Sequence, residues 1–412
     1  MMSHSLLAGL TVAILSIPGQ ALAQRTLSAA SKDPTVSTVL STIDAGRSGT
    51  ARLLVDIGSI VSPSGHESQR AEAVATEMRR IGLADVTLDT TPNVVGRIKG
   101  RSGKALVFVA TLDDLATVAT QQAAAHTGPR IEGDRVVGPG TNTSSTTAAL
   151  IAAAQALVKS GLRPEHDLVF AAVAQEETGL KGMQALYGQW KDRAIAFVDI
   201  LGDGHSISYG AITIHWWKVV AEGPGGHSLN GGVPNVNQGI GRAVDRILQL
   251  PQPEKYRDQR VVVNVAMLQS GAVYNHKPEN GWFSLDVRSL DGARVEEVEA
   301  AVRGILEQVT KETTIKFTME PTQLTPGGQI AGMRESPLVT TAAAISKYLG
   351  YDAELGNAGS SNMNVALGHG SPAIGIGGER GGQRGFADEW ADIPQMIRTA
   401  KFIALLAATI GM

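Results

Sequence analysis

The chain contains the stretch AAVAQEETG at residues 171–179, where an apolar, β-prone run ends in Glu176, Glu177 and then a glycine. Neighbouring side chains of a strand point to opposite faces, so two adjacent glutamates can face one site only where the strand ends and the backbone turns. Two carboxylates crowded at such a point either share a cation or raise each other's pKa. A solvated loop after a strand has the same pattern, so the meaning of the pair depends on the rest of the chain.

Other acidic residues follow apolar runs of the same kind. The runs that we interpret as buried parallel strands are 105–110, 167–174 and 194–200. Helix-like segments alternate with these runs, which predicts an α/β fold with a mostly parallel sheet flanked by helices. Ligand sites of such sheets lie beyond the carboxyl ends of the strands. We therefore expect one cleft to contain Asp113, Glu176, Glu177 and Asp199.

Composition excludes several function classes. The 412 residues carry a formal net charge of −3 and contain no cysteine, so disulfides and thiolate chemistry are excluded. Without a basic tract, no nucleic-acid partner and no binding to an anionic membrane are expected. A short apolar stretch at 6–18 precedes Ala21-Leu22-Ala23, which predicts a cleaved secretory signal peptide. The expected location is therefore periplasmic or secreted, with no membrane association after cleavage.

Several short motifs occur together in a recognisable order. They are Ser62-Pro63-Ser64-Gly65-His66-Glu67, Gly138-Pro139-Gly140, Glu176-Glu177, Asp199, Gly223-Pro224-Gly225-Gly226-His227-Ser228, Asn275, Leu285-Asp286-Val287-Arg288 and Asp388-Glu389-Trp390. From about Leu53 to the C-terminus the chain thereby resembles the di-zinc peptidases and amidohydrolases that include peptidase T, carboxypeptidase G, acetylornithine deacetylase and succinyl-diaminopimelate desuccinylase. The resemblance implies hydrolysis of amide or peptide bonds. It also implies a catalytic domain interrupted by a lid that often forms a dimer contact.

Pattern changes along the chain agree with an interrupted domain. Near Thr213 the alternation becomes that of a compact α+β unit, and the strand–helix pattern resumes near Thr325. Residues 24–50 are rich in Ser, Thr and Ala and are expected to form a loosely attached first helix. The predicted division is a signal peptide at 1–23, a catalytic domain at 24–212 and 325–412, and an inserted lid or dimerisation domain at 213–324.

The resemblance assigns roles to several side chains. Glu176 would be the general base that activates water. His227 would help to hold the oxyanion, within one chain or across a homodimer formed by the inserted domain. Asn275 and Arg288 would contact the substrate, Arg288 as the partner of a carboxylate. Asp113 would contact the metal ligands without binding the metal itself.

The zinc ligands that the resemblance implies are incomplete. Glu177 and Asp199 are retained, one for each zinc ion. The other three ligand positions of the family hold Thr111, Thr143 and Gly385. An aspartate of a nearby Ser-x-Asp-x-Asn pattern is replaced by Asn362. Zinc sites use three or four protein ligands, so we expect no zinc or weakly bound zinc rather than a normal di-zinc centre.

Three functions are compatible with these residues. The favoured one is an exported amidohydrolase- or peptidase-like enzyme that acts on a small amide or short peptide, with Glu176 as general acid/base. The second is a metal-independent acid/base enzyme, such as a lyase, isomerase or cyclase, because crowded acids raise each other's pKa. The third is a non-catalytic binding protein that keeps the substrate cleft.

Overall fold

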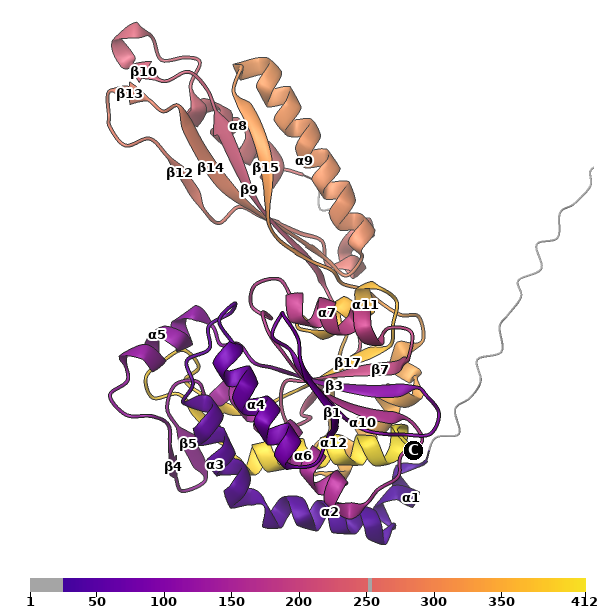
Figure 1. Cartoon of the computed structure of the whole chain (residues 1–412). Coiled ribbons are helices and arrows are strands. Elements are labelled where there is room, and N and C mark those ends of the chain that lie inside the picture. The colour runs from indigo at the N-terminus through magenta and orange to yellow at the C-terminus, as the bar shows by residue number, and fades with distance from the viewer. Residues whose placement is uncertain (1–24, 251–253) are drawn as a thin grey trace, which may run out of the picture.

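The computed structural model describes residues 25–250 and 254–412 of the chain. The predicted signal peptide at 1–23 lies outside the described residues. Figure 1 shows a lower part built on a large sheet and an elongated upper part formed by residues 213–325. The chain leaves the lower part before Thr213 and returns to it after Thr325.

The lower part is organised around an eight-stranded sheet with the order β1-β2-β6-β3-β7-β17-β8-β16. Its strands are β1 (Ala84–Leu88), β2 (Val94–Ile98), β3 (Ala105–Thr111), β6 (Asp167–Val173), β7 (Ala194–Ile200), β8 (Ser206–Ser208), β16 (Glu354–Gly356) and β17 (Ala373–Gly377). The central pairs β6/β3, β3/β7 and β7/β17 are parallel. This arrangement confirms the predicted α/β fold with a mostly parallel sheet.

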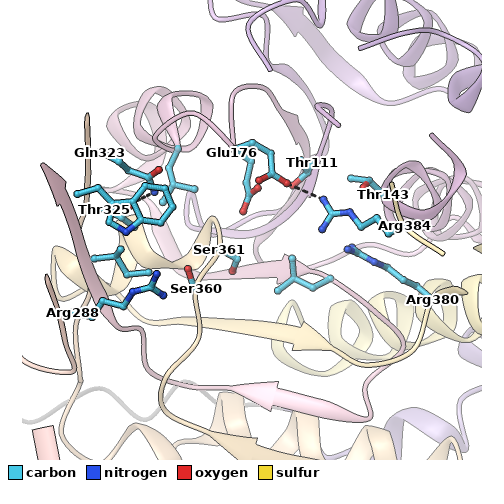
Figure 2. A pocket seen from close by; sticks show the side chains of 15 residues that line it. Thr111, Thr143, Glu176, Arg288, Gln323, Thr325, Ser360, Ser361, Arg380 and Arg384 are labelled. Atoms are coloured by element: carbon cyan, nitrogen blue, oxygen red, sulfur yellow. Dashed lines mark hydrogen bonds and ion pairs between the residues drawn. The ribbon is translucent and has the colours of Figure 1, made fainter. Parts of the chain in front are cut away.

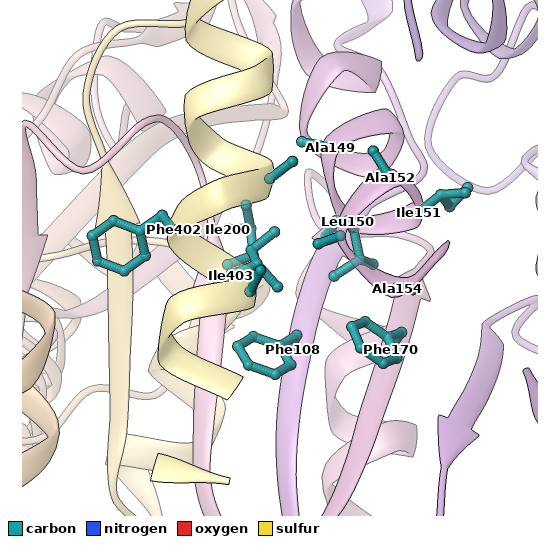
Figure 3. Packing of buried hydrophobic residues seen from close by; sticks show 14 of the residues in the cluster. Phe108, Ala149, Leu150, Ile151, Ala152, Ala154, Phe170, Ile200, Phe402 and Ile403 are labelled. Carbon is teal, nitrogen blue, oxygen red and sulfur yellow. The ribbon is translucent and has the colours of Figure 1, made fainter. Parts of the chain in front are cut away.

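The central strands are almost entirely apolar because both faces of the sheet are covered by helices. Along β3 and β6, alternate residues enter two different hydrophobic clusters. Phe108 and Phe170 point to one face and stack with their ring centroids 5.7 Å apart. Val107 and Val169 point to the other face. Figure 3 shows the first of these clusters, with α6 and α12 lying against the sheet.

Two groups of helices cover the sheet. The face of Phe108 packs against α3 (Arg47–Gly58), α4 (Ser68–Arg80), α6 (Thr141–Ser160), α10 (Pro337–Tyr348) and α12 (Ile393–Ile410). The opposite face packs against α7 (Lys181–Trp190) and α11 (Met363–Gly368). A further helix, α5 (Ala116–Ala124), follows β3. Helix α12 is long and apolar enough to cross a membrane, but most of it is buried in this core.

The N-terminal segment is attached more firmly than its composition predicts. It forms α1 (Leu27–Ser31) and α2 (Pro34–Ala45), and α2 packs against α6 and α12. Val36, Val39 and Ile43 are buried there, because their spacing places all three on one face of the helix. The expectation of a loosely attached helix was therefore wrong.

The inserted segment has its own sheet and core. Its strands are β9 (Thr213–Glu222), β11 (Val262–Asn264), β12 (Leu268–Ser270), β14 (Asn280–Ser289) and β15 (Lys316–Thr325). The long strands pair in the order β14-β9-β15. Helices α8 (Val236–Leu248) and α9 (Gly292–Thr313) share one hydrophobic cluster with this sheet. The short pair β10 (Gly226–His227) and β13 (His276–Lys277) lies at the tip farthest from the large sheet (Figure 1).

A small four-stranded sheet joins distant parts of the chain beside the large one. It consists of β4 (Arg130–Glu132), β5 (Arg135–Val137), β18 (Gly381–Gly382) and β19 (Trp390–Asp392). The glycine-rich loop around β18 is thereby fixed next to the start of α6.

Candidate active site

The turn after β6 orients both glutamates of the AAVAQEETG stretch. The strand ends at Val173, and Gln175 then takes a left-handed conformation with φ at +55°. Both carboxylate oxygens of Asp113 accept from the turn, at 2.9 Å from the backbone nitrogen of Glu176 and 3.0 Å from that of Glu177. The backbone therefore leaves its strand geometry at the point where two adjacent side chains must share one site.

The two glutamates face a cavity of about 620 Å³ between the large sheet and the base of the inserted segment. Figure 2 shows Glu176 near the middle of this cavity, with Arg288 on one side and Arg380 and Arg384 on the other. The lining residues are Thr111, Thr143, Glu176, Glu177, Leu180, Leu201, Ile214, Trp216, Arg288, Gln323, Thr325, Ser360, Ser361, Arg380 and Arg384.

Glu177 has a cationic partner in this cavity. The guanidinium group of Arg384 donates to the Glu177 carboxylate, with Nη2 and Oε1 2.9 Å apart. The loop that carries Arg384 is held by Glu389, which accepts from the backbone nitrogen of Gly385 at 3.0 Å. The other oxygen of Glu389 accepts from the backbone of Gly140 and Asn142 at the start of α6. The position of Arg384 is thus set by a buried carboxylate and not by an exposed loop alone.

Asp199 lies at the floor of the site and is almost completely buried. Its carboxylate accepts from the backbone nitrogen of Met363 at 3.2 Å and from the amide of Asn362 at 3.5 Å. The same amide donates to the hydroxyl of Thr111 at 3.1 Å. Burial raises the pKa of Asp199 to about 6, and these hydrogen bonds oppose the shift.

Crowding of the acids has its largest effect on Glu176. Burial raises the pKa of Glu176 to about 8, and the neighbouring charges of Glu177, Asp113 and Asp199 add to the shift. Arg380 is affected in the opposite sense, because burial and the nearby charge of Arg384 lower its pKa to about 10. Glu176 is therefore mostly protonated at neutral pH, whereas Arg380 stays charged.

A buried ion pair supports the chain just before this site. Arg70 and Asp114 are both almost completely buried, with Nη2 and Oδ2 2.7 Å apart. Arg70 also donates to the backbone oxygens of Leu112 and Ile60, at 2.8 and 2.5 Å. The pair therefore anchors the segment that carries Asp113 to helix α4.

Two residues predicted for the site lie outside the cavity of their own chain. His227 and Asn275 are hydrogen-bonded to each other, 3.0 Å apart, at the exposed tip of the inserted segment. Neither lines the cavity, whereas Arg288 does, close to its neighbour Asp286. Arg380 and Arg384 were not predicted for the site, because they occur in the glycine-rich loop 377–385 without a recognisable motif.

Within residues 25–250 and 254–412, no three His, Cys, Asp or Glu side chains are arranged so that they could hold a metal ion together.

Comparison with known proteins agrees with the motifs. A family model described as peptidase family M20/M25/M40 matches residues 114–409, which is more than half of the chain. Carboxypeptidase G2 from Pseudomonas sp. strain RS-16 is 26% identical over 226 residues, which are 53% of this chain and 52% of that protein. The chain thus matches only about half the length of this curated relative.

Solved structures show the same fold. Aminopeptidase PepT from Bacillus cereus superposes with a TM-score of 0.73 at 17% identity, covering 88% of this chain and 98% of that one. The YXEP protein of Bacillus subtilis, described as a dinuclear metal binding peptidase, gives a TM-score of 0.65 at 14% identity, covering 89% and 98%. The family resemblance inferred from the motifs is confirmed: the chain belongs to peptidase family M20/M25/M40, a family of peptide-bond hydrolases.

Proposed function

We propose that the protein is an exported amidohydrolase- or peptidase-like enzyme that acts on a small amide or short peptide with a degenerate zinc site, and that Glu176 moves the proton. The observation that carries this proposal is the ion pair between Arg384 and Glu177, 2.9 Å apart in the cavity. The resemblance assigns Glu177 to a zinc ion, but here a guanidinium group neutralises the same carboxylate. A cation that is part of the chain would thereby replace one that must be bound.

The remaining donors support the same reading. Asp199 already accepts two hydrogen bonds, from Met363 and Asn362. Thr143 offers a neutral hydroxyl, and Gly385 has no side chain that could bind a metal. Because zinc normally takes three or four nitrogen, oxygen or sulfur ligands, this donor set does not fit a di-zinc centre. No step of the proposed reaction uses one.

Glu176 would act first as a base and then as an acid. Its carboxylate takes a proton from a water molecule, whose oxygen attacks the amide carbonyl carbon. When the C–N bond breaks, Glu176 returns that proton to the leaving nitrogen, which yields an amine and a carboxylic acid. Hydroxyl groups of Thr111 and Ser361 line the same cavity and can donate to the carbonyl oxygen as it gains negative charge.

This role predicts a characteristic pH dependence. A general base must be unprotonated, and the pKa of Glu176 is about 8. We expect kcat/KM for amide hydrolysis to rise about tenfold per pH unit below that value and to level off above it. The measurement is release of free amine from a panel of dipeptides and N-acyl amino acids between pH 5 and 10. This range extends about three pH units below the pKa of Glu176. A rate that is independent of pH across this range contradicts the role.

A second candidate is the metal-independent lyase, isomerase or cyclase. It is favoured by the protonated state of Glu176 at neutral pH, which makes this side chain a proton donor rather than a base. In that case activity falls as the pH rises through about 8, the reverse of the hydrolytic profile. The direction of the pH profile therefore separates the two candidates.

Residue Gly385 provides a test of the degenerate zinc site. Its φ is +90°, and a Cβ there would meet the Thr117 hydroxyl oxygen at 3.2 Å. Gly385→His is therefore expected to lower the free energy of unfolding by about 1–2 kcal/mol, without creating a zinc site. Denaturant unfolding and zinc analysis measure the two effects. Gly103→His, at an exposed glycine with φ at +75°, controls for backbone strain alone. A Gly385→His variant as stable as wild type contradicts the expected strain, and one that holds zinc contradicts the claim that Arg384 occupies Glu177 in place of a metal ion.

The remote position of His227 supports a homodimer. His227 and Asn275 would meet a substrate if the inserted segment of a second chain reached the cavity, as the family resemblance implies. Around them, Leu229, Val233 and Tyr274 expose large apolar surfaces, as expected of a contact between chains. Export and dimerisation are tested by N-terminal sequencing of the secreted protein and by light scattering.

A further inference from the structure

Arg380 and Arg384 enter the cavity from one loop and one side. Figure 2 shows both guanidinium groups opposite Arg288, with Glu176 between the two sides. Nη2 of Arg384 is engaged by Glu177. Arg380 lines the same wall, and among the described residues its guanidinium group has no hydrogen-bond or ion-pair partner.

The wall beside these arginines contains buried polar atoms without partners. The hydroxyl oxygen of Thr143 and the Nε of Arg384 are both buried and lack a hydrogen-bond partner in the described part of the chain. Thr143 is only 3% exposed, and it lines the cavity on the same side as Arg384. Buried polar groups in folded proteins almost always have partners, so these two atoms are available to a water molecule or to the oxygens of a ligand.

The charge of the cavity favours an anion. Three arginines line it, and the only acidic side chains among its lining residues are Glu176 and Glu177. Among the described residues, Arg384 is paired with Glu177 and Arg288 with Asp286, which leaves Arg380 as the unpaired cation of the lining. Guanidinium groups bind carboxylate and phosphoryl oxygens with two parallel hydrogen bonds, and a threonine hydroxyl can add a third.

We propose that Arg380, Arg384 and Thr143 form an oxyanion subsite, and that the substrate carries acidic groups at both ends. The other acidic group is held by Arg288 across the cavity. The inference rests on the proposed function, in that it takes this cavity as the substrate site and Arg288 as one anchor. It adds the second anchor and so narrows the substrate class to small dianions.

Binding of simple dianions tests the subsite without any turnover. The probes are succinate, glutarate, adipate and pimelate, each compared by calorimetry with the monocarboxylate of equal chain length at constant ionic strength. At least one dicarboxylate is expected to bind about tenfold or more tightly than its monocarboxylate, as one added charged hydrogen-bonded contact provides. Arg380→Met should abolish this gain, whereas Arg334→Met, at an exposed arginine, should leave it unchanged.

Two further arms complete the test. Thr143→Val removes only a hydroxyl and should weaken the best dicarboxylate several-fold, which decides the matter if Arg380→Met does not fold. Comparison of 3-phosphonopropionate with succinate assigns the subsite to a phosphoryl or a carboxylate group.

The proposal is overturned if no dianion gains over its monoanion, or if the gain survives in Arg380→Met and Thr143→Val. If the wild-type protein binds dianions as expected but hydrolyses no amide, the proposed reaction is contradicted while the proposed subsite is supported.

Discussion

Glu176→Gln is expected to lower kcat/KM by about 10²–10⁴-fold, because proton transfer by a positioned side chain contributes that much to catalysis. Glutamine keeps the shape of the side chain but can neither accept nor return the proton. Substrate binding should change far less, since the arginines on both sides of the cavity remain. Steady-state kinetics on the best amide of the panel, together with calorimetric binding to the variant, measure the two effects.

Controls distinguish a chemical role from a structural one. Glu354→Gln makes the same change at an exposed position in β16 and should leave activity unaltered. The raised pKa of Glu176 provides a second readout. A carboxyl whose pKa is raised on folding favours the folded state below its unfolded value, and this contribution is lost as the pH rises through about 8. Wild type should therefore lose stability between pH 4.5 and 8, and Glu176→Gln should lose less. Full turnover by Glu176→Gln would show that Glu176 takes no part in the reaction.

Arg70→Met is expected to have the largest effect on stability, about 3–5 kcal/mol, because it leaves the buried carboxylate of Asp114 without its partner. It also removes the donor to the backbone oxygens of Leu112 and Ile60. Burial already raises the pKa of Asp114 to about 6 against the pull of Arg70, so the variant raises it further. The penalty should therefore shrink as the pH falls toward about 6, because Asp114 becomes neutral in the variant before it does in wild type, and should change little at lower pH.

Denaturant unfolding at two pH values measures this penalty. Arg79→Met, at an exposed position of the same helix, should stay within about 0.5 kcal/mol of wild type. The double variant Arg70→Met with Asp114→Asn should recover part of the loss, since no buried charge remains. Equal destabilisation by the single and double variants would show that the ion pair is not its cause.

The fold could be predicted from the sequence because its signals are local. The apolar runs that become β3, β6 and β7 are long enough to be unambiguous, and the acids after them fall at the strand ends. Helix α6 was harder, since it begins at Thr141, seven residues before its first alanine, Ala148. Its first turn is stabilised by Glu389, a residue distant in sequence that accepts from the backbone of Gly140 and Asn142. No local pattern encodes such a cap.

The candidate site could be predicted only in part for the same reason. Glu176, Glu177 and Asp113 are adjacent to a strand end, so their meeting follows from the pattern. Arg380 and Arg384 reach the cavity because β18 pairs with β19 in a separate small sheet, an arrangement without a sequence signature. Two arginines among glycines, close to the position of a missing ligand histidine, were the only available signal. The tip position of His227 depends on the length of β9 and β14, and motif order does not reveal it.

The central claim is that a guanidinium group, and not zinc, neutralises Glu177. It is tested most directly by elemental analysis of protein purified in the presence of zinc, combined with amide turnover before and after treatment with a chelator. We expect well below one equivalent of zinc per chain and unchanged turnover. Two tightly held equivalents of zinc, with activity that is lost to the chelator and restored by the metal, would contradict it.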